Sequence, residues 1–111
     1  MHRIETERNH RVAIVLAVGE VDAFAAPDLE AALAEVRGEQ RVLADLARVS
    51  FMDSTALGLI VRAARELGEA GATLRVVLPA GSARRIFEIT ALDRVLPVAE
   101  TRAEALVELS G

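Results

Sequence analysis

The sequence predicts an α/β fold: a mixed, mostly parallel β-sheet of four or five strands, with an N-terminal hairpin and four helices. Three observations predict it. Short apolar runs alternate along the chain with segments whose apolar residues recur at helical spacing. Strands that alternate with helices need crossover connections, so most of the sheet is parallel. The first two strands are instead separated only by a tight turn at Asn9-His10, which adds an antiparallel hairpin.

The predicted strands are runs of apolar residues that turn residues interrupt. Gly19-Glu20-Val21-Asp22 breaks the strong second strand, and Pro79 with Gly81 ends the fourth. The fourth run is apolar almost throughout, which is typical of a strand that is buried on both faces. Strands are expected over residues 3–8, 11–18, 41–46, 73–78 and 95–98.

Each predicted helix carries a single apolar stripe, which has to cover the sheet. Pro27 suits a first turn, where its missing N–H costs nothing, and Gly38 suits the position after a last turn. Ser82 caps the third helix, and a capping box that begins at Thr101 starts the fourth. Helices are expected from Pro27 to Gly38, from about Thr55 to Ala70, from Ser82 through Thr90 and from Thr101 through Leu109.

Length and composition restrict the class of protein. A chain of 111 residues fits one domain, so a single domain over residues 1–111 is expected. It has no cysteine, hence no disulfide and no thiol-based metal site. The net charge is −4, and the 13 basic residues, all Arg, are scattered, which argues against nucleic-acid binding. The longest apolar run, residues 12–18, is far shorter than the roughly 20 residues that span a bilayer. We therefore expect a cytoplasmic protein without a membrane span or a secretory signal.

Catalytic motifs are missing from the sequence. It contains no Gly-x-Ser-x-Gly elbow, no P-loop and no His-Glu-x-x-His. His2 and His10 lie near one end of the chain without cysteines or paired acids nearby, so neither a metal site nor a catalytic triad is expected. The protein is therefore predicted not to be an enzyme and to hold no cofactor.

The residues around Ser54 connect a predicted strand to the central helix. Asp53, Ser54 and Thr55 are residue types that start helices, because their side-chain oxygens accept hydrogen bonds from free backbone N–H groups. The Ser54 hydroxyl therefore either caps the helix, bonding the N–H of Ala56 or Leu57, or accepts a phosphate. A helix start suits a phosphate, since it offers unpaired N–H groups and the positive end of the dipole. Thr55 is the rival acceptor, although its hydroxyl is expected to turn toward the local backbone.

The side chains just before Ser54, and Asp22 in the earlier turn, also have structural interpretations. Asp53 either positions the Ser54 hydroxyl or a kinase-bound metal, or it is a favourable carboxylate at a helix N-terminus. Asp22 is a turn residue by pattern alone. Phe51 and Met52 either contact a partner or fold back onto the helix, and at least one of them is expected in the core.

Three stretches resemble a known family. Residues 50–58, Ser-Phe-Met-Asp-Ser-Thr-Ala-Leu-Gly, are similar to the region around the phosphorylated serine of the STAS domain family, in particular of the stand-alone anti-sigma factor antagonists of bacteria. Residues 19–22 resemble the Gly-Glu-Leu-Asp turn of that family, and residues 89–98 resemble its passage from a helix to the last strand. The resemblance extends from about residue 12 to residue 109. One departure is Ala56, where the family commonly has glycine, and this would add a methyl group beside the site.

The resemblance implies a binding module that phosphorylation controls. In the family the phosphoacceptor follows the Asp, which makes Ser54 the matching residue here, and the Asp of the turn, matched by Asp22, is implicated in partner binding. The dephosphorylated form would bind an anti-sigma factor that is also a GHKL-type ATP-dependent serine kinase, and so release a sigma factor. Phosphorylation of Ser54 would end that complex, and a metal-dependent Ser/Thr phosphatase would restore it. The partner-binding residues are expected to be Asp22, Met52, Asp53, Ser54 and Thr55.

Two other functions remain open. STAS-like domains also serve as permanent subunits of lipid or anion transport assemblies or of large stress-sensing complexes, where Ser54 or Thr55 would belong to a constant interface. A cryptic serine hydrolase is the third possibility, although Asp53-Ser54-Thr55 lacks a credible general base.

Overall fold

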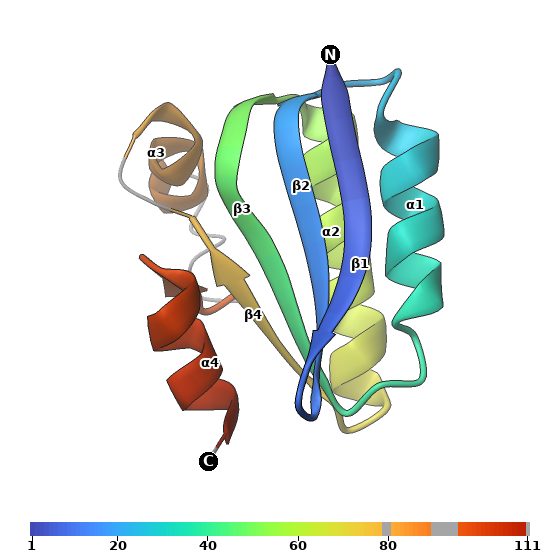
Figure 1. Ribbon diagram of the computed structural model, residues 1–111. Coiled ribbons are helices and arrows are strands. Elements are labelled where there is room, and N and C mark those ends of the chain that lie inside the picture. Colours follow the sequence, from blue (N-terminus) through green and yellow to red (C-terminus); the bar gives the residue numbers. More distant parts are fainter. Residues whose placement is uncertain (79–80, 90–95, 111) are drawn as a thin grey trace.

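A computed structural model gives the structure of the protein and describes residues 1–78, 81–89 and 96–110. The strands within these residues are β1 (His2–Asn9), β2 (Val12–Val21), β3 (Arg41–Met52), β4 (Thr73–Val77) and β5 (Val98–Ala99). They form one sheet in the order β1-β2-β3-β4-β5 (Figure 1). The β1–β2 pair is antiparallel, and each later strand is parallel to its neighbour. The predicted mixed, mostly parallel sheet with an N-terminal hairpin is confirmed.

The helices of the described part lie in two layers around the sheet. They are α1 (Ala26–Glu35), α2 (Ser54–Glu69), α3 (Ser82–Ile89) and α4 (Arg102–Ser110). Helices α1 and α2 lie side by side across one face, whereas α4 packs against β3, β4 and β5 (Figure 1). Among the described residues, no helix covers the β1–β2 part of the α4 face (Figure 1).

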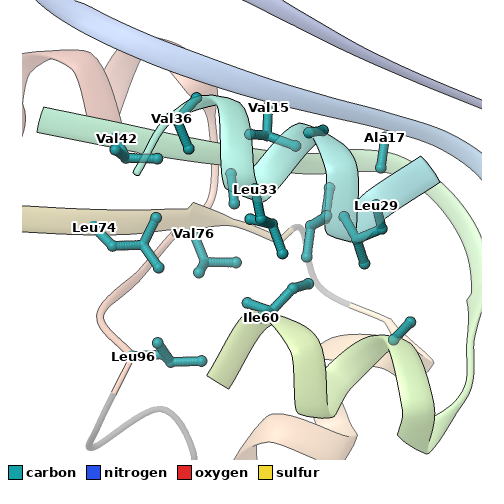
Figure 2. Packing of buried hydrophobic residues seen from close by; sticks show 14 of the residues in the cluster. Val15, Ala17, Leu29, Leu33, Val36, Val42, Ile60, Leu74, Val76 and Leu96 are labelled. Carbon is teal, nitrogen blue, oxygen red and sulfur yellow. The ribbon is translucent and has the colours of Figure 1, made fainter. Parts of the chain in front are cut away.

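Strand β2 supplies apolar side chains to a core on each side of the sheet. Successive residues of a strand point to opposite faces, so an unbroken apolar run is needed to fill both. Val15 packs with Leu29 of α1 and Ile60 of α2 (Figure 2), while Ile14 packs with Leu109 of α4. The two cores hold α1, α2 and α4 on the sheet and thereby fix the strand ends from which the loops leave.

Strands β2 and β3 both run farther than predicted. β2 continues through Gly19 to Val21, where a break was expected, and β3 continues to Met52 although its apolar run ends at Leu46. Two register irregularities between the strands accommodate the polar residues. Gly19 has a φ of 88°, and a side chain there would collide with the carbonyl oxygen of Met1. The boundaries were wrong because pairing between neighbours, which the local sequence does not reveal, extends both strands.

The other boundaries differ by smaller amounts. Helix α1 ends at Glu35 rather than near Gly38, and β5 is a two-residue strand instead of residues 95–98. Residue 95 lies outside the described residues, as does Thr90 at the expected end of α3. The cap of α4 is confirmed, since Thr101 Oγ1 accepts a hydrogen bond of 3.1 Å from the backbone N–H of Glu104.

Candidate functional site

The candidate site lies where β2 and β3 end. Val21 and Met52 are register partners, and the next residue, Asp53, donates its backbone N–H to Val21 O at 3.2 Å. The loop after β2 and the start of α2 are therefore adjacent at the carboxyl ends of parallel strands, at the upper edge of the sheet in Figure 1. This edge is where ligands bind in open α/β sheets. The prediction that the third strand ends at Leu46 and is followed by a loop was wrong. Because β2 and β3 are both longer than predicted, Asp22 and Asp53 lie at the same end of the molecule.

Asp53 is the residue that caps α2. Its backbone is extended, with φ −93° and ψ 177°, and its Oδ1 accepts a 3.0 Å hydrogen bond from the N–H of Ala56. Its own carbonyl accepts from the N–H of Leu57 at 3.1 Å. The alternative in which Ser54 caps the helix is wrong by one position, because the cap oxygen comes from the preceding residue. Ser54 is instead the first helical residue.

The hydroxyl of Ser54 is free at the surface. The residue is exposed, and its Oγ makes no hydrogen bond within residues 1–78, 81–89 and 96–110. Thr55 is also exposed, and its hydroxyl shows no bond to the local backbone of the described chain, contrary to expectation. Both alcohols are therefore available to a reagent from solution, and Ser54 is the one nearer the helix start.

A shallow depression begins at Ser54 and follows the outer face of α2. Its volume is about 440 Å³. Its lining residues are Ser54, Leu57, Gly58, Val61, Arg62 and Arg65. The hollow exists partly because Gly58 has no side chain, and nothing lies within 4 Å of where a Cβ would stand. This surface, called the Ser54 depression below, combines apolar side chains with two guanidinium groups.

Aromatic side chains stand exposed at the same end of the molecule. Phe24, in the loop after β2, is 87% exposed, and Phe51, near the end of β3, is 53% exposed. Met52 is half-buried against the larger core, which confirms that at least one of this pair packs inward. Phe24 was missed in the sequence, where the available signal is a lone aromatic among turn residues, off the apolar stripe of α1.

Asp22 shapes the loop that carries Phe24. Its Oδ1 accepts hydrogen bonds from the N–H groups of Phe24 at 3.0 Å and Ala25 at 3.3 Å, an Asx turn. Its carbonyl accepts from Ala25 and Ala26 at 3.0 Å each. The carboxylate is half-buried and engaged by backbone donors. The structural role of Asp22 is thus to hold the conformation of this loop. A contact between Asp22 and a partner stays a prediction.

Ala56 does not flank the approach to Ser54. Its side chain is fully buried within the larger core. The expectation that its methyl group lies beside the site is therefore wrong: the second helical position after Ser54 points inward. The open position of this helix turn is Gly58 instead.

A buried carboxylate that the sequence reasoning missed lies farther down β3. Asp45 is 5% exposed, its Oδ2 accepts from Arg102 Nε at 2.8 Å, and its Oδ1 accepts from the N–H of Ala47 at 3.0 Å. Arg102 Nη2 also lies 2.7 Å from Glu7 Oε1. Burial alone would lower the pKa of Arg102, but the hydrogen bonds to Asp45 and Glu7 raise it above its ordinary value. The available signal was an Asp inside an apolar strand.

Two further findings concern the part of the chain that the structure describes. There, no three His, Asp or Glu side chains are grouped so that they could hold a metal ion. Among the same residues, no helix combines the length and apolar character that crossing a membrane requires.

A model of the STAS domain family matches residues 3–105. The chain therefore belongs to the STAS domain family, as residues 50–58 predicted. It is 34% identical over 99 residues to the anti-sigma-B factor antagonist of Staphylococcus aureus, which covers 87% of this chain and 92% of that relative.

Solved structures share this fold. The anti-sigma factor antagonist from Mycobacterium paratuberculosis superimposes with a TM-score of 0.92 at 27% identity, over 100% of this chain and 96% of that one. The Bacillus cell fate determinant SpoIIAA in its phosphorylated form has a TM-score of 0.75 at 23% identity and covers 96% of this chain and 98% of its own. The second likeness concerns the fold alone.

Proposed function

We propose that the protein is an anti-sigma factor antagonist, formed as a single STAS domain over residues 1–111, whose binding to an anti-sigma factor is ended by phosphorylation of Ser54. The observation that carries the proposal is the exposed, unbonded hydroxyl of Ser54 at the first position of α2. The similarity to an anti-sigma-B factor antagonist over 87% of the chain supports the choice of partner.

The partner would be an anti-sigma factor that is also a GHKL-type serine kinase, and ATP belongs to that partner. In the phosphorylation step, Ser54 Oγ forms a bond to the γ-phosphorus of ATP, the bond to the bridging oxygen breaks, the hydroxyl proton is lost and ADP leaves. A metal-dependent Ser/Thr phosphatase would return Ser54 to the alcohol by hydrolysis and so restore binding.

A phosphate on Ser54 should leave the fold intact. The N–H groups of Ser54 and Thr55 belong to the first turn of α2 and have no acceptor within the helix. Together with the helix dipole they favour an anion by roughly 0.3–1 kcal/mol, while the neighbouring Asp53 repels it. These opposing local effects are comparable, so the added charge of about −1.5 to −2 acts mainly on whatever docks there.

The surface around Ser54 has the composition of a docking site. Phe24 and Phe51 offer exposed aromatic area, which often carries much of the binding energy of protein interfaces. The Ser54 depression adds apolar side chains and the cation of Arg65, which has no ion pair in the described part of the chain. A partner that covers this end of the molecule must desolvate position 54. A phosphate in that position would therefore oppose docking.

The test is to measure the affinity of a candidate anti-sigma factor for the wild type, Ser54→Ala and Ser54→Asp. We expect Ser54→Ala to bind as the wild type does and to resist phosphorylation, and Ser54→Asp to bind at least about ten-fold more weakly. Thr55→Ala is the matched control, and mass spectrometry should still find its phosphate on Ser54. Equal affinities for all three proteins would overturn the proposal. Recovery of a transporter or of a large stress complex in a pull-down would favour a permanent subunit instead.

A further inference from the structure

A second hollow lies at the opposite end of β3 from Ser54. It is a groove of about 480 Å³ between the β1–β2 hairpin, the start of β3 and the last turns of α4. Its lining includes Arg11, Val12, Arg41, Leu106, Val107 and Leu109. The volume falls within the range of small-molecule sites, roughly 300–1,000 Å³. It will be called the basic groove.

The shape of the groove follows from the sheet and the helix. Val12 and Ile14 face the α4 side of the sheet, where α4 covers β3, β4 and β5 and leaves the hairpin open (Figure 1). The buried side chains of Val12 and Leu109 form its floor, and Val107, which is 72% exposed, forms part of its rim. The floor is therefore apolar, fixed by the core and open to solvent.

The cations of the groove are not neutralised within the described chain. The guanidinium groups of Arg11 and Arg41 have no hydrogen bond or ion pair to residues 1–78, 81–89 or 96–110. The nearby acids are occupied elsewhere: Glu7 pairs with Arg102 at 2.7 Å, Glu39 with Arg8 at 2.7 Å and Glu108 with Arg75 at 3.2 Å.

Within the described residues, the helix end beside the groove does not compensate these charges. The C-terminus of α4 offers only about half a negative elementary charge, which is small against two guanidinium groups. The protein as a whole carries a net charge of −4, so a cavity with two free cations differs from its surroundings. A site that joins an apolar floor to unpaired cations matches a ligand with an apolar body and an acidic head.

We propose that the basic groove binds a small, free anionic amphiphile, a short acyl chain that ends in a carboxylate or phosphate. The acid group lies on Arg11 and Arg41, and the chain lies along Val12 and Leu106, with Val107 at the rim. The groove is at the amino end of β3 and Ser54 follows its carboxyl end, so this binding is independent of the proposed phosphorylation switch.

The probe is octanoate, titrated into the full chain by calorimetry and by amide NMR. Octanol and octylammonium have the same tail with a neutral and a cationic head, and they are the matched ligands. We expect octanoate to bind at least about ten-fold more tightly than either, because charged hydrogen bonds to guanidinium groups are lost in both. The amide shift changes should be confined to residues 9–12, 41 and 106–110.

Protein variants test the same site without touching its core. Arg41→Gln should weaken octanoate binding about ten-fold, whereas Arg37→Gln, which removes the same charge at the end of α1, should not change it. Val107 is exposed, so it can be varied without disturbing the fold: Val107→Glu should weaken and Val107→Lys should strengthen binding.

Each result of the octanoate titrations either supports or overturns the assignment of the basic groove. Tighter binding of octanoate with opposite effects of the two Val107 variants supports the assignment. The assignment would be overturned if octanoate did not bind, or if octanol bound equally tightly. It would also be overturned if the protein bound vesicles that contain phosphatidylglycerol but did not bind free octanoate. None of these results bears on the phosphorylation of Ser54, so the two proposals fail separately.

Discussion

Asp53 and Ser54 are consecutive, yet the structure gives them different tasks. The side chain of Asp53 accepts a hydrogen bond from the N–H of Ala56, which fixes where α2 begins. The side chain of Ser54 makes no hydrogen bond within the described residues and lies on the surface. A capped helix start fixes the backbone of the next residue, and so the position from which the Ser54 hydroxyl projects. The residue that positions the alcohol is therefore separable from the alcohol itself.

Replacing Asp53 should show this separation. Asp53→Ala removes the cap and should destabilise the protein by about 1 kcal/mol, measured by urea unfolding. Asp53→Asn keeps an oxygen that accepts the same hydrogen bond, so its stability should lie within a few tenths of a kcal/mol of the wild type. If the carboxylate also helps the kinase, Asp53→Asn will be phosphorylated more slowly at unchanged stability. Equal loss of stability in both variants would contradict the cap assignment.

Helix α2 contains two glycines whose backbone conformation does not require glycine. Gly58 and Gly68 are both exposed, and nothing lies within 4 Å of a Cβ built at either position. Glycine in a helix interior is worse than alanine by about 1 kcal/mol. Gly58 lines the Ser54 depression, whereas Gly68 does not. Gly58 therefore makes α2 less stable than alanine would, and its missing side chain leaves the Ser54 depression open.

The two glycines form a matched pair for experiment. Gly58→Ala and Gly68→Ala should each raise the free energy of unfolding, by up to about 1 kcal/mol. Only Gly58→Ala should weaken binding of the anti-sigma factor, because its methyl group fills the Ser54 depression. Equal affinities of the two variants would show that the partner does not use this face of α2.

The type and order of the elements could be predicted because their periodicity is strong, whereas their ends could not. The residues after Leu46 were read as a loop, but they continue β3 by pairing with residues 18–21 of β2 across two register irregularities. In the site, Ser54 was placed correctly at a helix start, but which neighbour caps it depends on backbone angles. The exposure of Phe24 depends on tertiary packing, and the local sequence offered only one weak signal, a lone aromatic among turn residues and off the apolar stripe of α1.

An ion-pair cluster joins three elements of the fold. Arg102, at the start of α4, bonds Asp45 of β3 and pairs with Glu7 of β1. Asp45 also bonds the N–H of Ala47, where the register between β2 and β3 shifts. The cluster therefore ties the C-terminal helix to the strand that leads to Ser54.

Removing only the cation of this cluster should destabilise the protein more than removing the cation together with its buried carboxylate partner. Arg102→Leu leaves the buried carboxylate of Asp45 uncompensated and should lower the free energy of unfolding by about 3 kcal/mol. Adding Asp45→Leu should recover part of that loss, because the unpaired charge is then gone. Urea unfolding of both single variants and the double variant measures the coupling. Strictly additive losses would mean that the two side chains do not stabilise one another.

The first residue of the chain is held at the same end as Ser54. Met1 O accepts the N–H of Glu20 at 3.1 Å, and Glu20 is the register partner of Phe51. Any reporter or affinity tag fused ahead of Met1 would therefore emerge among the aromatic side chains and crowd the anti-sigma factor. One fused behind α4 would instead crowd the basic groove, so each end of the chain should carry the label only when the other surface is being assayed.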